Sequence, residues 1–309
     1  MRRSSFDAAE IDRLPWRGPG DGRPALPLPP GKLPMFGPGR RLRKRWRYVG
    51  VFCDEFMLCA ARAQVGPFGQ TFWAVVDRSS GEIWERTRKL PPFVRGEVWS
   101  ERAEGGHWPI GSDEPGVVTL LDANEVGAGL RIGEGRWAES ICPAEGPGES
   151  GYVWTRKRIA PVECDLRLPG GRRIERTAYG IEDESAGYHP RHTVWSWSAG
   201  VGVATDGRAV GWNLVSGVND PPERSERAIW LDGEPREPGP VRFDDDLSGI
   251  DFESGSRLDF DAEATRRASE NLGLLRFTYR QPFGSFSGSL DGTELAEAYG
   301  VMEHHDAVW

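Results

Sequence analysis

Apolar and polar residues alternate most regularly within residues 187–233, and we predict that this segment forms one antiparallel hairpin. Asp206 and Gly207 stand between two alternating runs, and Asp-Gly is a preferred pair for a two-residue turn because both central positions need positive φ. Such a turn pairs Thr205 with Arg208. Since side chains alternate across a strand, this pairing predicts a bulky face made of Trp195, Trp197, Ala199, Val201, Val203, Val210, Trp212, Leu214, Ser216 and Val218.

The opposite face of the predicted hairpin is small and rich in glycine. Glycine inside a strand often marks a bend, or a place where a ligand comes close to the backbone. We therefore predict a sheet that curves around a cavity, with ligand contacts from Asn213, Ser196, Ser198 and Gly211. Two alternatives stay open: the Asn213 amide satisfies turn backbone instead, and the tryptophans form a platform for a sugar instead of a packed core.

The rest of the chain also predicts strands, in segments separated by proline and glycine. Residues 14–39 are too rich in proline and glycine to form a helix or a central strand. Beyond them come short strand-like runs with turn signals about every 8–12 residues, a spacing typical of sandwiches and barrels. A break at residues 143–151 is the best linker candidate. We predict an all-β protein with an extended arm (1–45), a barrel-like domain (46–145) and a second barrel-like domain that carries the ligand site (146–309).

Composition agrees with a globular all-β protein. The chain has 40 glycines and 24 prolines, which leave little room for long helices, while 13 tryptophans and 13 phenylalanines supply a core. A net charge of −8 argues against nucleic acid as a partner. No apolar run is long enough to span a membrane, and none follows the N-terminal arginines as in a signal peptide, so we expect a cytoplasmic protein.

Cysteines and charged runs add little chemistry. The four cysteines form no C-x-x-C pair, and we expect reduced thiols, no metal site and no cofactor. The basic residues within 40–47 are predicted to be a solvated lead-in to the first strand. The acidic residues 182–184 are predicted to be a solvated loop, because their spacing does not match a calcium loop.

Several blocks of the chain carry a resemblance: RWRYVGVF (45–52), HTVWSWSAGVG (192–202), GWNLVSGVND (211–220), SERAIWLDGEP (225–235), GSFSG (284–288) and GVMEHHDAVW (300–309). From about residue 14 onward the sequence resembles a bacterial family with a domain of unknown function. That family is distantly similar to the two-barrel, lipocalin-like superfamily that includes carotenoid hydratases and tocopherol cyclase. The resemblance implies two packed antiparallel lipocalin-like β-barrels or half-barrels with an apolar pocket for an isoprenoid or lipid-like molecule, and it assigns no catalytic residue.

Ionisable residues near two strand ends are the candidates for chemistry. Glu303 and His305 share one side of a predicted closing strand. Either they pair with arginines at a barrel rim, or they project into the cavity as an acid and the group that tunes it. His189 and His192 have a spacing that would suit metal ligands on a helix, but Pro190 breaks a helix there. We expect them at a strand entrance, where they either satisfy backbone groups or act, His192 as a proton donor and His189 as a ligand contact.

Three functional classes follow from the sequence. The first is a hydratase, cyclase or isomerase that protonates a hydrophobic substrate, and the second is a carrier that binds an isoprenoid or lipid without chemistry. A carbohydrate-active protein that uses tryptophans and paired carboxylates ranks last. An enzyme needs an ionisable group with a perturbed pKa inside the cavity, whereas a carrier can have a purely apolar lining.

Overall fold

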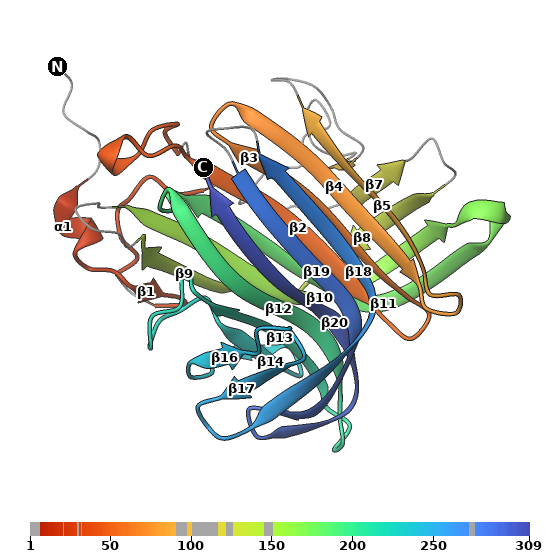
Figure 1. Ribbon diagram of the computed structural model, residues 1–309. Coiled ribbons are helices and arrows are strands. Elements are labelled where there is room, and N and C mark those ends of the chain that lie inside the picture. The colour runs from red at the N-terminus through yellow and green to blue at the C-terminus, as the bar shows by residue number, and fades with distance from the viewer. Residues whose placement is uncertain are drawn as a thin grey trace.

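The computed structural model describes residues 7–20, 22–29, 31, 33–90, 98–100, 117–121, 126–144, 151–271 and 276–309. Within these residues the strands form two antiparallel sheets, which confirms the predicted all-β class (Figure 1). Helical structure is limited here to the one-turn helix α1 (Ala8–Ile11) and two 3₁₀ turns, Pro38–Arg40 and Pro169–Gly171.

The first sheet has the strand order β5-β4-β3-β2-β11-β10-β8-β7-β6, and β9 adds a branch by pairing with both β10 and β1. The sheet curls so that β6 returns toward β3 and β4, and the curl encloses an apolar core that includes Val49, Leu58 and Val162. Its strands are β1 (Trp16–Arg17), β2 (Lys44–Phe52), β3 (Phe56–Val65), β4 (Phe68–Asp77), β5 (Glu82–Leu90), β6 (Val98–Ser100), β7 (Val117–Leu121), β8 (Gly127–Ile132), β9 (Ala138–Pro143), β10 (Tyr152–Arg167) and β11 (Arg173–Gly187).

The second sheet has the order β15-β14-β13-β12-β20-β19-β18-β17-β16. It curls in the same way, because β16 returns toward β13, and it encloses its own core around Trp212, Phe260 and Phe286. Its strands are β12 (His192–Ala204), β13 (Ala209–Ser216), β14 (Ala228–Leu231), β15 (Glu234–Arg236), β16 (Val241–Phe243), β17 (Gly249–Phe252), β18 (Arg257–Asn271), β19 (Arg276–Leu290) and β20 (Thr293–Val308). Each sheet is therefore barrel-like, as predicted.

A third apolar core joins the two sheets. Phe52, Met57 and Ile181 from the first sheet pack in the same cluster as Trp197 and Phe283 from the second. Strands β12 and β20 lie against β2, and β18 lies against β5. The outer surface of each curled sheet near this contact is thus buried by the other sheet.

The proline-rich arm lies on the first sheet. Its leucines Leu26, Leu28 and Leu33 pack against aromatic side chains that include Trp154 and Tyr188. Residues 1–6 of the predicted arm and 145–150 of the predicted linker lie outside the described residues. The chain passes from the first sheet to the second at residues 188–191, because β10 and β11 belong to the first sheet. The sheets therefore change well after the predicted boundary at 145/146, and the division into domains 46–145 and 146–309 stays a prediction.

Strands β12 and β13 form the predicted hairpin, but the predicted register is wrong by one residue, because Trp197 pairs with Val215. The loop has three residues instead of two. In it only Gly207 takes positive φ, at 88°, while the Asp206 carboxylate accepts hydrogen bonds from the amide (3.1 Å) and guanidinium (2.8 Å) of Arg208. A three-residue loop with glycine in the left-handed position is a common alternative to the two-residue turn. The one-residue shift exchanges which residues of the two strands share a face.

The shifted register mixes the two predicted faces of the hairpin. The Trp212 indole lies over Gly200, where an added Cβ would come within 2.2 Å of the ring. On the other side of β13, an added Cβ on Gly211 would come within 2.6 Å of Ile159, a residue of β10. Each glycine therefore makes room for a bulky side chain, and neither borders a cavity.

Candidate active site between the sheets

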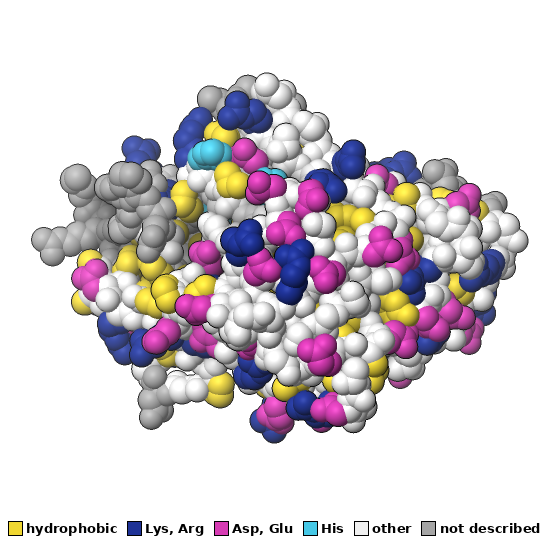
Figure 2. Space-filling view, turned by 60° about the horizontal axis from the view of Figure 1, so that its bottom comes forward, with side chains coloured by type: hydrophobic (Ala, Val, Ile, Leu, Met, Phe, Trp, Pro, Cys, Tyr) yellow, Lys and Arg dark blue, Asp and Glu magenta, His cyan; other side chains and the backbone are white. Residues whose placement is uncertain are grey.

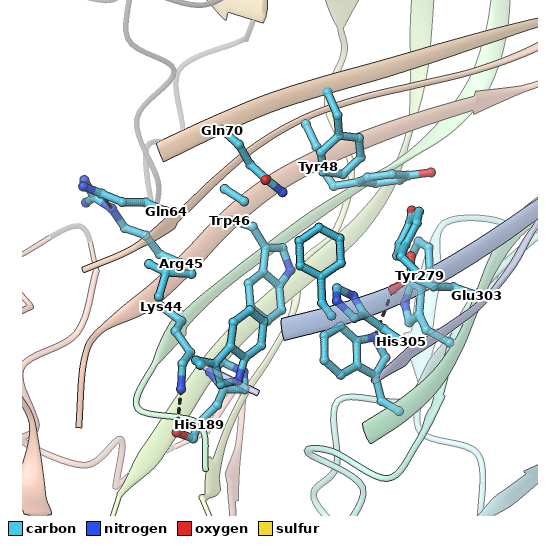
Figure 3. A pocket seen from close by; sticks show the side chains of 18 of the residues that line it. Lys44, Arg45, Trp46, Tyr48, Gln64, Gln70, His189, Tyr279, Glu303 and His305 are labelled. Carbon is cyan, nitrogen blue, oxygen red and sulfur yellow. Dashed lines mark hydrogen bonds between the residues drawn. The ribbon is translucent and has the colours of Figure 1, made fainter. Parts of the chain in front are cut away.

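A cavity of about 470 Å³ lies between the two sheets. Strands β2 to β5 line one side and β12, β18, β19 and β20 line the other. About half of the lining residues are aromatic or aliphatic, although apolar atoms make up most of the lining surface; the aromatic members are Trp46, Tyr48, Phe68, Phe72, Trp195, Trp197, Phe277, Tyr279 and Trp309. Figure 3 shows Trp46 and Tyr48 from the first sheet and Tyr279 from the second on the walls of this cavity. The first sheet supplies half of the walls of this cavity, and the location of a ligand site in the C-terminal domain stays a prediction.

Glu303 is one of the acidic residues that line this cavity. It projects from β20 and is 9% exposed. Its Oε1 accepts a hydrogen bond from Nε1 of Trp195 (3.0 Å), and its Oε2 accepts one from Nε2 of Gln281 (3.1 Å). Burial raises the pKa of Glu303 to about 7, although the bond from Trp195 acts in the opposite direction. At neutral pH the carboxyl group is therefore present in both its acid and its ionised form.

Two tyrosines and one arginine surround the acid end of the cavity. The hydroxyl groups of Tyr48 and Tyr279 are buried. Burial and the nearby Glu303 carboxylate hold the pKa of Tyr279 well above its usual range, so this phenol stays protonated. The Arg266 guanidinium lies 4.4 Å from the centre of the Phe72 ring and 5.0 Å from that of Tyr279, and Nη2 donates to Thr87 Oγ1 (2.6 Å).

His305 lies beside Glu303 on the same side of β20, as predicted from alternation. Its ring centre is 4.2 Å from that of Trp195 and 5.3 Å from that of Tyr279. Burial, together with neighbouring His304, lowers the pKa of His305 to about 3. The imidazole is therefore neutral at physiological pH and suits a role in tuning Glu303 better than a role as the acid.

A second cluster of polar side chains faces the cavity, and its members come from the first sheet and from the connection between β13 and β14. Nζ of Lys157 lies 2.5 Å from Asp183 Oδ1 and 3.4 Å from Glu226 Oε1, and Nδ2 of Asn219 donates to Glu226 Oε2 (2.9 Å). Burial raises the pKa of Asp183 to about 6, with Lys157 opposing and Glu226 adding to the shift. One positive charge thus faces two buried carboxyl groups.

His189 lines the cavity from the segment that joins β11 to β12. It is 1% exposed, its ring centre lies 5.1 Å from that of Trp46, and neither ring nitrogen bonds to a described residue. The backbone is fixed from the other side, because Nζ of Lys44 donates to the His189 carbonyl oxygen (2.9 Å). Burial and the cations Lys44 and Arg41 hold the pKa of His189 well below its usual range, so the ring is neutral.

The acidic run at 182–184 is a buried part of β11, and the prediction of a solvated loop is wrong. Nε of Arg47 lies 2.9 Å from Glu184 Oε1, and Nε of Arg156 donates to Glu184 Oε2 (2.7 Å). Nε of Arg158 donates in the same way to Glu182 Oε2 (2.8 Å). Arg47 is 1% exposed, so the predicted solvation of the basic run at 40–47 is also wrong there. Charges can be buried here because the strand register places acids opposite bases.

Five of the predicted site residues lie away from the cavity. Ser198 accepts from Trp212 Nε1 (3.0 Å) inside the second sheet's core, and Gly211 faces Ile159. Asn213 is fully buried between Trp197, whose Nε1 donates to its Oδ1 (2.7 Å), and the Glu226 carbonyl (3.0 Å).

His192 is exposed and Ser196 is half-buried on the outer face of β12. His192 Nε2 lies 2.9 Å from Asp306 Oδ1, and Ser196 Oγ lies 3.2 Å from His304 Nδ1. Their displacement follows from alternation along β12, which turns these two side chains outward while Trp195 and Trp197 turn inward.

Metal and membrane features are limited to two observations. Among the described residues, no three His, Cys, Asp or Glu side chains gather in an arrangement that could hold a metal ion. No helix in the described part of the chain is long and apolar enough to cross a membrane. Figure 2 shows acidic and basic side chains interspersed over one face of the molecule, with small apolar areas between them.

Three solved structures match this chain at low sequence identity. An AttH-like protein of Nitrosomonas europaea is 13% identical, with a TM-score of 0.46 over 91% of this chain and 98% of that chain. Kievitone hydratase of Nectria haematococca is 9% identical, with a TM-score of 0.44 over 86% and 88%. CghA is 14% identical, with a TM-score of 0.43 over 86% and 88%.

Among curated proteins, none matches the sequence significantly. The match to a family begins beside the predicted linker and runs to the last residue. Residues 147–309, more than half of the chain, match the family described as Domain of unknown function (DUF2804), and the chain belongs to this family.

Proposed function

We propose that the protein binds a mainly apolar small molecule between its sheets and that Glu303 transfers a proton to this molecule. The observation that carries the proposal is a buried carboxyl group with a pKa of about 7 in an aromatic cavity. Such a group can donate or accept a proton at neutral pH, because its protonated and ionised forms differ little in free energy. A site for binding alone has no need of a buried, titrating acid.

The proposed step begins with the protonated form of Glu303. The carboxyl proton moves to one carbon of a substrate C=C bond, the π electrons form the new C–H bond, and the adjacent carbon becomes a cation. Aromatic faces such as those of Trp195 and Tyr279 stabilise a positive charge next to them. Exclusion of bulk water protects the cation from unwanted capture.

Three outcomes share this first step. In hydration, a water molecule attacks the cation and loses a proton to the Glu303 carboxylate. In isomerisation, a neighbouring C–H bond loses its proton to the carboxylate instead. In cyclisation, a second C=C bond of the substrate attacks the cation before the proton is lost. Each route restores the Glu303 acid, and the protein's residues serve all three.

A carrier function is the second candidate, and the mainly apolar lining favours it as well. The carbohydrate-active class has less support, because Trp197 is 4% exposed and Trp212 is fully buried, so neither presents a free face to a sugar. The experiments must therefore separate binding from chemistry.

Binding is tested first by native mass spectrometry and solvent extraction of the purified protein, and by titration with the neutral apolar dye N-phenyl-1-naphthylamine. Ala63 lines the cavity, and Ala63→Trp is expected to fill it and weaken dye binding at least about tenfold. Val194 lies on the exposed face of β12, and Val194→Trp is the matched control that should leave dye binding unchanged. Equal affinities for both variants would contradict the proposed location.

Chemistry is tested by incubating the copurified molecule with the protein in D₂O and following deuterium at carbon by mass spectrometry. The wild-type protein is expected to incorporate deuterium, and Glu303→Gln is expected to stop incorporation because its amide cannot donate an acidic proton. Glu294, which is exposed on the same strand, supplies the control Glu294→Gln. If the wild-type protein binds the molecule but incorporates no deuterium, the enzyme function is refuted and the carrier function remains.

A further inference from the structure

We propose that the ligand carries a hydroxyl or carbonyl oxygen, which His189 binds at the end of the cavity opposite Glu303. This inference rests on the proposed function, because it assumes that a small molecule occupies the cavity. It adds the substrate class: an apolar molecule with an oxygen function at one end and the reacting double bond at the other. A pure hydrocarbon does not belong to this class.

His189 is held in place as a binding group. Its carbonyl oxygen and that of Pro190 both accept hydrogen bonds from Nζ of Lys44, at 2.9 and 3.3 Å. The ring packs beside Trp46, with ring centres 5.1 Å apart, and is 1% exposed. Backbone and ring are thus both fixed. The residue lines the cavity, and both ring nitrogens are buried without a hydrogen-bond partner among the described residues.

The chemistry of this ring selects an oxygen function. A neutral imidazole offers one N–H donor and one acceptor nitrogen, and burying both unpaired is costly. A hydroxyl group can satisfy either nitrogen and a carbonyl oxygen can satisfy the donor. The charges that act on His189 come from the cations Lys44, Arg41 and Lys157, and these disfavour a ligand ammonium group at the same place.

The two ends of the cavity are chemically distinct and separated. Figure 3 places His189 and Glu303 on opposite sides of the pocket, with aromatic rings between them. Along β2, Lys44 contacts the His189 end and Tyr48 lies at the Glu303 end, four residues further on. Four residues of an extended strand span about 13 Å. The ligand oxygen and the reacting bond are therefore expected to be separated by roughly this length.

The test uses farnesol and the matching hydrocarbon farnesene as probes, each displacing N-phenyl-1-naphthylamine from the full-length protein. Wild-type protein is expected to bind farnesol about five- to tenfold more tightly than farnesene, which is the range for one hydrogen bond. His189→Leu should remove this preference while leaving farnesene affinity unchanged. His189→Gln should keep most of the preference, because an amide also offers a donor and an acceptor. Circular dichroism of each variant checks that it folds.

Each outcome decides between the two proposals. A farnesol preference that falls with His189→Leu and returns with His189→Gln supports the inference. If both probes bind equally and His189→Leu changes neither affinity, the inference is overturned while the apolar cavity stands. If Glu303→Gln removes the preference for farnesol while His189→Leu keeps it, the ligand oxygen binds at the Glu303 end of the cavity. This result also overturns the inference. If neither probe binds, the proposed apolar ligand fails, and the inference fails with it.

Discussion

Replacing Glu303 by glutamine is expected to stabilise the protein above neutral pH. The folded-state pKa of this carboxyl group is raised, so the folded protein binds the proton more tightly than the unfolded chain does. The folded state therefore loses stability as pH rises from the ordinary pKa of 4.5 through the folded pKa of about 7. Glu303→Gln removes this loss, because an amide has nearly the same shape and does not ionise.

The size of the effect follows from the two pKa values. A folded pKa of about 7 against an ordinary value of 4.5 corresponds to about 3 kcal/mol, at about 1.4 kcal/mol for each pKa unit. At pH 8 the variant should therefore exceed the wild type by about 3 kcal/mol in free energy of unfolding. At pH 5, where folded Glu303 is mostly protonated, the advantage should fall below about 1 kcal/mol.

Urea titrations followed by tryptophan fluorescence at pH 5 and pH 8 measure both differences. Glu294→Gln on the exposed side of the same strand is the control and should show no pH-dependent gain. If Glu303→Gln gains nothing at pH 8 relative to pH 5, the carboxyl group is not held in an ionisation-resistant site, and the proposed proton transfer loses its basis. A gain in stability together with a loss of deuterium incorporation would show that the acid is kept for function at a cost in stability.

Five further substitutions, two of them controls, test other parts of the structure. Glu184→Ala should lower the free energy of unfolding by about 3–5 kcal/mol in urea, because two buried arginines lose their shared carboxylate. Glu163→Ala breaks an ion pair with 64% exposed side chains and should cost less than about 1 kcal/mol. Gly211→Val should cost about 1–3 kcal/mol by overpacking against the first sheet, whereas Gly129→Ala, with open space around it, should change the melting temperature little. His192→Ala should leave dye affinity within about twofold, because its side chain is 59% exposed; a tenfold loss would place it at the site after all.

Local patterns in the sequence predict much of this fold. Turn residues and alternation predict the β12–β13 hairpin, because a hairpin is a contact between neighbouring segments. The register of the β12–β13 hairpin could not be predicted, since Asp206-Gly207 suits a two-residue and a three-residue loop equally well. The shift by one residue moved Gly211 and Asn213 to the face of β12 that carries Trp197. Ser196 and Ser198 lie away from the cavity for a different reason, because the tryptophan face of β12 borders the cavity and the small face does not.

The site depends on contacts that no local pattern reveals. Alternation places Glu303 and His305 on one side of a strand, but Tyr48 and Arg266 join them from strands distant in the sequence. The burial of the acidic run at 182–184 could not be predicted from a local pattern either. Its burial depends on arginines of two neighbouring strands, and the cost of burying charge without them made a solvated loop the natural prediction.

Because strands near both ends of the chain build the walls of the cavity, the site has consequences for assembly of the molecule. Residues 44 and 309 both border it, so its walls meet only after the most distant parts of the sequence have come together. Contacts of such long range form late and slowly. Until then the tryptophans that later line the cavity are exposed to water, and the incompletely folded chain carries an aggregation-prone apolar surface. A ligand that binds only the closed pair of sheets draws the equilibrium toward the finished molecule. A small molecule bound in this cavity would therefore stabilise the assembled protein against unfolding.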